Sequence, residues 1–278
     1  MIDGNTQLIA HIGFPTHSFK SPLIYNPYFE HAGINACVVP MSCEPQHFNG
    51  LLNGLKPLGN LLGALITMPH KTAVMSLLDD VSTTAQIAGS CNAIKFDASG
   101  RLIGDMFDGE GFVRGLAAKG FSPAGKRALV VGSGGVGCAI AASLAQSGVM
   151  ALALYDTNHV NAQALAQRLQ KHYPQLTVTT HHNDPTDCDL VVNATPLGMN
   201  VGDPLPIDVS KLSPNTFVGE VVMRTQRTAF VQAAQAAGCQ VQVGVDMLFE
   251  QIPAYLEFFG LPSTTARKLR ASAQLDAS

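Results

Sequence analysis

The sequence predicts an α/β fold with two domains, and three observations support this prediction. The chain has 278 residues, which is more than one core of average size comfortably fills. Short apolar runs alternate with longer amphipathic segments, as in proteins whose parallel strands are connected by helices. In addition, a glycine-rich segment at residues 132–137 follows an apolar run and precedes another amphipathic segment. We therefore expect repeated strand–helix units along the chain.

The first part of the chain is expected to alternate between strands and helices. The expected strands are Leu8–Phe14, Asn35–Pro40, Leu62–Thr67, Ser90–Phe96 and Arg101–Asp105. Proline suits the first turn of a helix, so one helix should begin near Pro69. The other expected helices are Pro22–Ala32 and about Glu44–Leu55.

A second set of strand–helix units is expected after a linking helix at Gly109–Lys119. Its strands are Arg127–Val131, Ala151–Tyr155, Thr177–Thr180, Leu190–Asn193 and Phe217–Val222. Its helices are Gly135–Ser147 and about Asn158–Lys171. From about Gly244 the chain should be helical, with one buried stripe formed by Met247, Ile252, Leu256 and Phe259.

The composition favours a small-molecule ligand. Charged residues make up only 13% of the chain, and the net charge is -3 with no block of like charges, so neither nucleic acid nor a membrane is an expected partner. The beginning of the chain does not resemble a signal peptide, and the six cysteines form no CxxC pair. His181 and His182 lie near Asp184 without a third ligand at a suitable spacing, so we expect no metal. We expect a cytoplasmic protein with buried reduced thiols, and either a monomer or a homodimer fits.

The segment from Gly132 to Gly137 predicts a dinucleotide-binding loop. A G-x-G-x-x-G pattern between a strand and a helix allows a tight turn, close approach of a pyrophosphate and packing of the helix on the strand. The helix N-terminus adds N–H groups and the positive end of its dipole. The expected cofactor-binding residues of this loop are Gly132, Gly134, Gly135, Val136 and Gly137.

Asp156 indicates which dinucleotide is bound. It ends the next expected strand, where a carboxylate can bond both ribose hydroxyls of NAD and would repel the 2′-phosphate of NADP. The three residues that follow supply no arginine for such a phosphate. We therefore expect NAD, with NADP less favoured, although Asp156 could instead only cap the following helix.

A lysine and an aspartate suit hydride transfer at a secondary alcohol. The segment Thr67–Lys71 is followed by Asn92 and Asp108. When a hydride leaves carbon, the hydroxyl proton must leave as well, and a lysine whose pKa is lowered by partial burial can take it. On the residues alone, a surface lysine and a helix-capping aspartate are the more economical interpretation.

Six segments, taken in order over nearly the whole chain, resemble the shikimate/quinate dehydrogenase family. They are Gly13-x-Pro15 with Ser21-Pro22, Thr67–Lys71, Gly89–Ala93, Gly104–Gly109, Asn193–Met199 and Gly244–Gln251. The resemblance implies a substrate-binding α/β domain at residues 1–107, completed by 244–278. It also implies an inserted NAD(P)-binding Rossmann domain at residues 108–243, with a cleft between the two domains.

The resemblance further implies roles for individual residues. Lys71 and Asp108 would be the acid/base pair for hydride transfer between NAD and the C3 hydroxyl of shikimate, quinate or a close analogue. The substrate would be bound by Ser18, Ser21, Thr67, Asn92 and Gln251. The dinucleotide site would be completed by Thr195, Gly244 and Met247.

The part of the family pattern that binds the substrate carboxylate is altered in this chain. The family usually has two hydroxyl residues there, whereas this chain has Phe19 at the first position and Ser21 at the second. Ser18 lies one position early, and a phenyl ring against a carboxylate is unfavourable without a replacement hydrogen bond. The other departures replace an Asn-Thr pair, a tyrosine and a glycine, and they are Met106, Phe107, Met223 and Asp246.

Several alternatives remain open on the sequence. Either shikimate is a poor substrate and a relative such as quinate or an amino analogue is the true one, or the lost bonds are supplied by Ser18, Tyr25 or Arg224. An NADP-dependent biosynthetic shikimate dehydrogenase is a further alternative. A non-catalytic dinucleotide sensor would be expected to lose the acid/base pair, which this chain keeps.

Overall fold

In the computed structural model, residues 2–225 and 227–275 are described, and they divide into two units. Unit 1 consists of the residues up to Ala85, of Gly89–Phe107 and of the residues from Ile252 onward, and unit 2 consists of Gln86–Ala88 and Asp108–Gln251. The sequence prediction placed the return to the first domain at residue 244, where helix α9 (Gly244–Phe258) begins. The unit boundary lies within this helix, and residues 276–278 of the predicted domain lie outside the described part of the chain.

Unit 1 is built on a mixed sheet with the strand order β2-β1-β3-β5-β6-β4. Its strands are β1 (Gln7–Gly13), β2 (Ala36–Ser42), β3 (Leu61–Ile66), β4 (Asp80–Val81), β5 (Ala93–Phe96) and β6 (Leu102–Asp105). Strand β1 pairs in parallel with both β2 and β3. The loop after β1 and the segment after β3 therefore begin at the same edge of the sheet.

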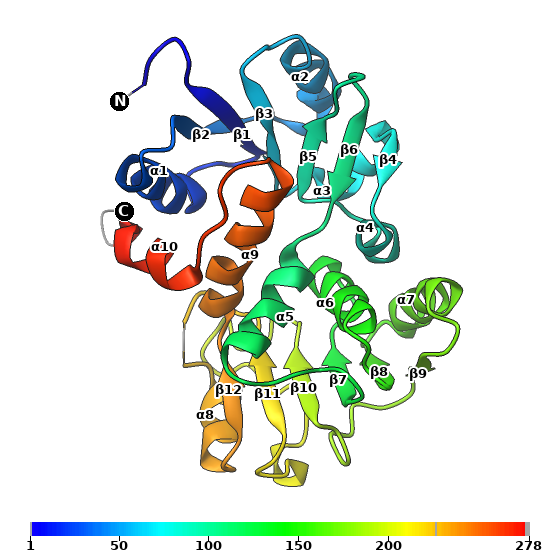
Figure 1. Cartoon of the computed structure of the whole chain (residues 1–278). Helices are drawn as coiled ribbons and strands as arrows, with labels where there is room; N and C mark the ends of the chain where they lie inside the picture. Colours follow the sequence, from blue (N-terminus) through cyan, green and yellow to red (C-terminus); the bar gives the residue numbers. More distant parts are fainter. Residues whose placement is uncertain (1, 226, 276–278) are drawn as a thin grey trace. The chain divides into compact units, whose positions relative to one another are not determined.

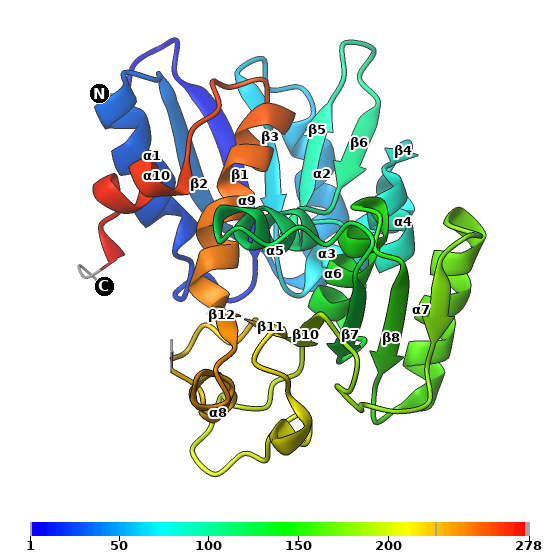
Figure 2. The same ribbon diagram turned by 60° about the horizontal axis from the view of Figure 1, so that its bottom comes forward.

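Helices cover the sheet of unit 1, and α1 lies beside α10 and β2 (Figure 2). The helices are α1 (Ser21–Ala32), α2 (Phe48–Leu55), α3 (His70–Ala73), α10 (Ala266–Ser272) and the second part of α9, with 3-10 turns at Pro45–His47 and Val74–Leu77. Phe48 and Leu52 of α2 pack with Ile12 of β1 and Ile66 of β3 in one apolar core. This packing fixes the ends of β1 and β3 relative to each other.

Unit 2 contains a fully parallel sheet with the order β12-β11-β10-β7-β8-β9 (Figure 1). Its strands are β7 (Arg127–Val131), β8 (Ala151–Tyr155), β9 (Thr177–Thr179), β10 (Leu190–Asn193), β11 (Phe217–Glu220) and β12 (Gln240–Gln242). This is the strand order of a Rossmann fold, in which the order reverses between β7 and β10. Ligands of such sheets bind at the carboxyl ends of the strands beside this reversal.

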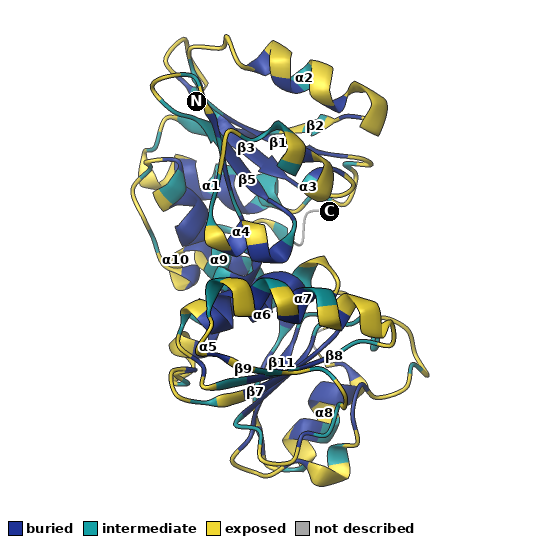
Figure 3. Ribbon diagram, turned by 90° about the vertical axis from the view of Figure 1, so that its right-hand side faces the viewer, coloured by how far each residue is buried: buried dark blue, intermediate teal, exposed yellow. Residues whose placement is uncertain are grey.

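The helices of unit 2 are α5 (Asp108–Ala118), α6 (Gly135–Gln146), α7 (His159–His172), α8 (Ala229–Ala236) and the first part of α9, with a 3-10 turn at Val209–Lys211. Of these helices, α7 and α8 have buried inner and exposed outer faces, whereas α6 is buried along almost its whole length (Figure 3). Helix α4 (Thr83–Ala88) lies across the boundary of the two units. The predicted stripe of α9 and the residue after it is confirmed, since Met247, Ile252, Leu256 and Phe259 are all buried. Among the described residues, no helix combines the length and the apolar character that crossing a membrane requires.

Candidate functional site

The glycine loop after β7 is shaped by two different requirements. Gly132 has φ +104, and a Cβ on it would lie 2.6 Å from the carbonyl oxygen of Ala194. A Cβ on Gly137 would lie 1.9 Å from the carbonyl oxygen of Gly132. The first and last glycines are therefore required by packing within unit 2. In contrast, a Cβ on Gly134 or Gly135 would meet no atom within 4 Å.

The open space in front of these two middle glycines fits a dinucleotide pyrophosphate. Gly134 directly precedes α6 and provides no side-chain cap, so the first N–H groups of this helix have no partner within the helix. Such N–H groups at the positive end of the helix dipole bind phosphate oxygens. The predicted residues of the loop, including Val136, lie at this end of the helix.

Asp156 follows β8 and is linked to the glycine loop. Its carboxylate accepts hydrogen bonds from the backbone N–H of Ser133 at 2.7 Å and of Asn158 at 2.8 Å. Helix α7 is capped by the side chain of Asn158, which accepts a hydrogen bond from Val160 N, so Asp156 is not its N-cap residue. A carboxylate oxygen accepts more than one hydrogen bond, and Asp156 therefore keeps capacity for ribose hydroxyls.

A buried polar network holds the loops that follow β10 and β11. Asn193 accepts a hydrogen bond from the Thr195 hydroxyl at 2.6 Å and donates to Glu220 at 3.0 Å, and Thr228 donates to Glu220 at 2.8 Å. Glu220 is fully buried, and this burial raises its pKa. Since a Cβ on Gly132 would lie 3.0 Å from Thr195 Cγ2, the network also positions Thr195 against the glycine loop. Sequence reasoning missed Glu220, whose signal was a carboxylate inside an apolar run.

Asp108 is the first residue of α5, and its side chain is buried. Glycines bring α5 into backbone contact with its neighbours: a Cβ on Gly109 would lie 2.0 Å from the carbonyl oxygen of Ala139 in α6, and one on Gly111 would lie 2.5 Å from Gln251 Cβ in α9. The Oε1 atom of Gln251 is buried without a hydrogen-bond partner. A buried carbonyl oxygen without a partner is rare in proteins, and a bound ligand that donates to it is one explanation.

Two predicted cofactor-binding residues, Gly244 and Met247, lie at the start of α9, and both are buried. Gly244 is buried, and a Cβ on it would lie 2.5 Å from the carbonyl oxygen of Val222. Its lack of a side chain is thus required by packing. Met247 is also buried, at 3% exposure. Cofactor contacts of both residues stay predictions.

In unit 1, the ends of β1, β3 and β5 bring the predicted residues Thr67, Lys71 and Asn92 together. The Thr67 N–H donates to the carbonyl oxygen of Ile12, and the Ile66 N–H donates to that of Asn92. The carbonyl oxygen of Lys71 accepts from Cys91 N at 2.8 Å, while the Lys71 side chain is half-buried. Asn92 is almost completely buried and accepts from Phe107 N at 2.9 Å through its side-chain oxygen.

Sequence reasoning did not single out His11, which lies beside this group. Its ring stacks on Phe19 with 3.9 Å between the ring centroids and 22° between the planes, and its Nδ1 atom is buried without a partner. Burial, and secondly the positive charge of Lys71, lower the pKa of His11 to about 4. A Cβ on Gly13 would lie 2.5 Å from Thr67 Cγ2 and 2.8 Å from Phe19 Cζ. The available signal was one polar residue inside an apolar strand.

Comparisons with known proteins show the family of the chain. The family model described as "Shikimate dehydrogenase substrate binding domain" matches residues 12–94. A protein of Rubrobacter xylanophilus named shikimate dehydrogenase (NADP(+)) is 35% identical over 254 residues, which cover 90% of this chain and 89% of that protein. The chain belongs to the shikimate/quinate dehydrogenase family. As a member of this family, it is a dehydrogenase.

Two solved structures share the fold over almost their full length. Quinate dehydrogenase from Corynebacterium glutamicum in complex with NAD superposes with a TM-score of 0.84 at 29% identity, covering 95% of this chain and 98% of that one. The ligand-free 5-ketofructose reductase of Gluconobacter sp. strain CHM43 superposes with a TM-score of 0.90 at 25% identity, covering 97% of this chain and 98% of that one. The predicted α/β fold class is confirmed.

Three of the departures from the family pattern, Met106, Phe107 and Asp246, are buried or make contacts within their own unit. Met106 is fully buried, and the Phe107 ring contacts Tyr255 edge-on with 5.0 Å between the ring centroids. Asp246 forms an ion pair with Lys119 at 3.1 Å and accepts from Val243 N. These residues therefore stabilise the unit in which each lies.

The residues that were expected to replace the missing hydrogen bonds to the substrate carboxylate lie in different surroundings. Ser18 is exposed, and Ser21 is half-buried at the first position of α1. Tyr25 is buried, its hydroxyl has no hydrogen-bond partner, and burial raises its pKa well above the ordinary value. In unit 2, Met223 and Arg224 are both exposed.

Other features of the chain contribute no further site to this family fold. No group of three His, Cys, Asp or Glu side chains suited to a metal occurs in the described part of the chain, and Asp184 pairs with Lys211 at 2.7 Å. Four of the six cysteines are buried, whereas Cys37 and Cys188 are only half-buried.

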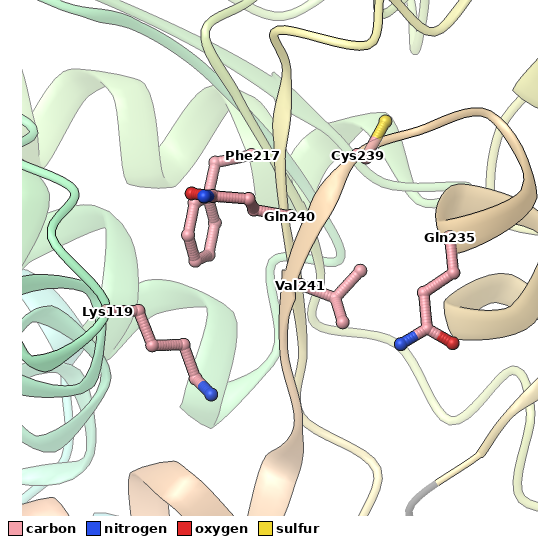
Figure 4. Close-up of a pocket in the computed structure, with 6 residues that line it drawn as sticks. All are labelled: Lys119, Phe217, Gln235, Cys239, Gln240 and Val241. Carbon is pink, nitrogen blue, oxygen red and sulfur yellow. The ribbon is translucent and has the colours of Figure 1, made fainter.

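The pocket of about 410 Å³ in unit 2 is separate from the dinucleotide loop. The residues that line it surround strand β12 (Figure 4), and they are Lys119, Phe217, Gln235, Cys239, Gln240 and Val241. Phe217 and Gln240 are the first residues of β11 and β12. The pocket thus lies at the amino ends of the strands, whereas the glycine loop and Asp156 follow carboxyl ends.

Proposed function

We propose that this enzyme transfers a hydride between NAD and the C3 hydroxyl of shikimate, quinate or a close cyclic analogue. The observation that carries the proposal is the glycine loop joined to Asp156 at the carboxyl edge of a Rossmann sheet, in a chain of this family. The substrate contacts come from the residues of unit 1 at the ends of β1, β3 and β5, together with Gln251.

The proposed roles follow from the chemistry of alcohol oxidation. The bound nicotinamide supplies the hydride acceptor in this direction. Loss of the hydride and of the hydroxyl proton converts the secondary alcohol to a ketone, and Lys71 takes the proton while Asp108 orients the hydroxyl. The Thr67 hydroxyl and the Asn92 and Gln251 amides bond the remaining ring hydroxyls.

Asp156 supports NAD as the cofactor. Its carboxylate is half-buried and fixed by Ser133 N, so a 2′-phosphate at the ribose site would meet a negative charge that cannot turn away without losing this bond. The Rubrobacter relative is named for NADP(+), whereas the Corynebacterium structure contains NAD. Cofactor choice within the family therefore varies, and the residue after β8 is the one that we expect to decide it here.

A second candidate substrate class is favoured by the Phe19–His11 stack. Phe19 stands at the position where the family's pattern has a hydroxyl residue for the substrate carboxylate, and its ring stacks on His11. The Gluconobacter relative is named a reductase of 5-ketofructose, which is a keto sugar without a carboxylate. A cyclic polyol or keto sugar is therefore the alternative to a cyclic acid.

The test is a steady-state assay of the purified enzyme with shikimate and quinate, each with NAD and with NADP. We expect NAD-dependent turnover, and Lys71→Met should lower kcat by about 100-fold to 10000-fold because general acid/base catalysis is lost. Binding of NAD, measured by calorimetry, should be unchanged in this variant, and Lys56→Met on the exposed surface of unit 1 is the control. Equal turnover by Lys71→Met, or a preference for NADP, would contradict the corresponding part of the proposal.

A further inference from the structure

The Phe19 ring, stacked on the buried imidazole of His11, forms a fixed apolar surface in unit 1. The Phe19 N–H donates to the carbonyl oxygen of Thr16 at 3.0 Å, which closes the turn that carries the ring. The Phe14 N–H donates to the carbonyl oxygen of Met68 at 3.0 Å, which joins this loop to the segment after β3. Backbone hydrogen bonds therefore hold the Phe19 ring over His11 rather than leaving it on a loose loop.

This surface lies close to the residues assigned to the substrate. A Cβ on Gly13 would touch both Thr67 Cγ2 and Phe19 Cζ, so the threonine and the phenyl ring flank the same backbone position. Lys71 is near enough to His11 for its positive charge to contribute, after burial, to the lowered pKa of that histidine. A substrate bonded to Thr67 and Lys71 would thus meet the Phe19 ring with one of its other ring substituents.

A carboxylate is a poor partner for this surface. Transfer of a charged group next to hydrocarbon without a new hydrogen bond is strongly unfavourable. His11 cannot compensate as a cation, because its lowered pKa leaves the imidazole neutral at ordinary pH. Phe19 itself offers no hydroxyl, so the hydrogen bond that the family pattern places at this position is lost. In contrast, the C–H face or a hydroxymethyl group of an uncharged ring carries no such penalty.

We propose that the Phe19–His11 stack receives an uncharged end of the substrate ring, so that the enzyme acts on a cyclic polyol or keto sugar in preference to a carboxylic acid. This inference rests on the proposed function, because it concerns the same site and the same hydride transfer at a ring hydroxyl. It assigns to Phe19 and His11 the role of specificity-determining residues.

The test uses substrate pairs that differ only at the carboxyl group. Shikimic and quinic acid are compared with the alcohols in which –COOH is reduced to –CH₂OH, each with NAD at pH 8. We expect kcat/KM for each alcohol to exceed that for the matched acid by at least about tenfold, as the loss of one charge-assisted hydrogen bond predicts.

Variants at position 19 separate charge recognition from ring volume. Phe19→Ser supplies a hydroxyl and should lower the alcohol-to-acid ratio of kcat/KM by about tenfold or more. Phe19→Leu keeps an apolar side chain and should retain the preference for the alcohol. Phe14→Ser is the matched control, since it removes an exposed phenyl ring from the same loop and should leave the ratio within about twofold.

The outcomes distinguish this inference from the proposed function. If the wild-type enzyme uses the acids as well as or better than the alcohols, the inference is overturned while the proposed function stands. Turnover of neither member of either pair, with NAD or NADP, overturns both. If the alcohols are preferred but Phe19→Ser leaves the ratio unchanged, Phe19 is not the determinant. Should Phe19→Ser not fold, the wild-type pairs and Phe19→Leu still decide, because an acid preference in either contradicts the inference.

Discussion

Protonation of His11 should make the folded protein sensitive to mild acid. The pKa of His11 lies at about 4 in the folded chain, because of burial and secondly the charge of Lys71, against an ordinary value of 6.5. Between these two pH values the unfolded chain binds a proton that the folded chain does not. Stability is therefore full above about pH 7, falls as the pH drops toward 4, and falls no further from this cause below that value.

The size of this effect follows from the two pKa values. A difference of one pKa unit corresponds to about 1.4 kcal/mol, so the penalty from His11 reaches roughly 2 kcal/mol at pH 5 and roughly 3 kcal/mol at pH 4. His11 is only 7% exposed, and solvent screening therefore reduces the penalty little. A loss of this size is a substantial fraction of the stability of an ordinary domain.

The assay is urea unfolding of wild type and His11→Gln between pH 7.5 and pH 4.5, followed by the fluorescence of tyrosines such as Tyr25 and Tyr28, which are buried in unit 1. Any effect of His11→Gln on the free energy of unfolding that does not depend on pH cancels, because only the change of this free energy with pH is compared. The variant should lose about 2 kcal/mol less than wild type by pH 5. His31→Gln, at an exposed position of α1, should follow wild type. Parallel curves for wild type and His11→Gln would refute the reasoning, as would an NMR titration of His11 with its midpoint near 6.5.

Three further predictions concern unit 2. Asp156→Asn keeps an acceptor for Ser133 N but removes the charge, so the ratio of kcat/KM with NADP to that with NAD should rise about tenfold in steady-state assays. An unchanged ratio would show that Asp156 does not select between NAD and NADP. Gly134→Ala should have the melting temperature of wild type but bind NAD about tenfold more weakly. Gly137→Ala, whose Cβ would overlap the carbonyl oxygen of Gly132, should instead lower the melting temperature by about 5 °C. Calorimetry measures both effects, and equal melting temperatures of the two variants would contradict the packing argument. Glu220→Ala should destabilise the protein by about 3 kcal/mol in urea unfolding because Asn193 and Thr228 lose their partner, and Glu220→Gln, which keeps an acceptor, should cost clearly less.

The strands and the dinucleotide loop could be predicted because their signals are local. The apolar runs Arg127–Val131, Ala151–Tyr155 and Leu190–Asn193 match the observed strands at both ends. The glycine pattern is confined to six consecutive residues, and the structure gives Gly132 and Gly137 a steric reason at their own positions. The short strands β4 and β12 were not predicted, because two or three residues provide little periodicity, although β9 was predicted despite its similar length.

The contacts of the site could not be predicted, because they join residues far apart in the sequence. Asn193 and Glu220 end neighbouring strands, and only the strand order β10-β11 makes them partners. The sequence showed that Phe19 replaces a hydroxyl residue, but not that its ring stacks on His11. One polar residue within an apolar strand does not reveal which loop folds over it.

The hydrogen bond from Ser133 N to Asp156 ties cofactor choice to the shape of the phosphate loop. A lineage that exchanges this aspartate for an apolar or basic side chain loses an acceptor for the loop at the same step. The exchange is tolerated only after another group has taken over the Ser133 N–H, so the order of mutations matters. Ancestral intermediates with neither acceptor would hold the pyrophosphate poorly and bind both dinucleotides weakly. Changes of cofactor in descendants of this sequence should therefore appear as coupled substitutions at the ends of β7 and β8.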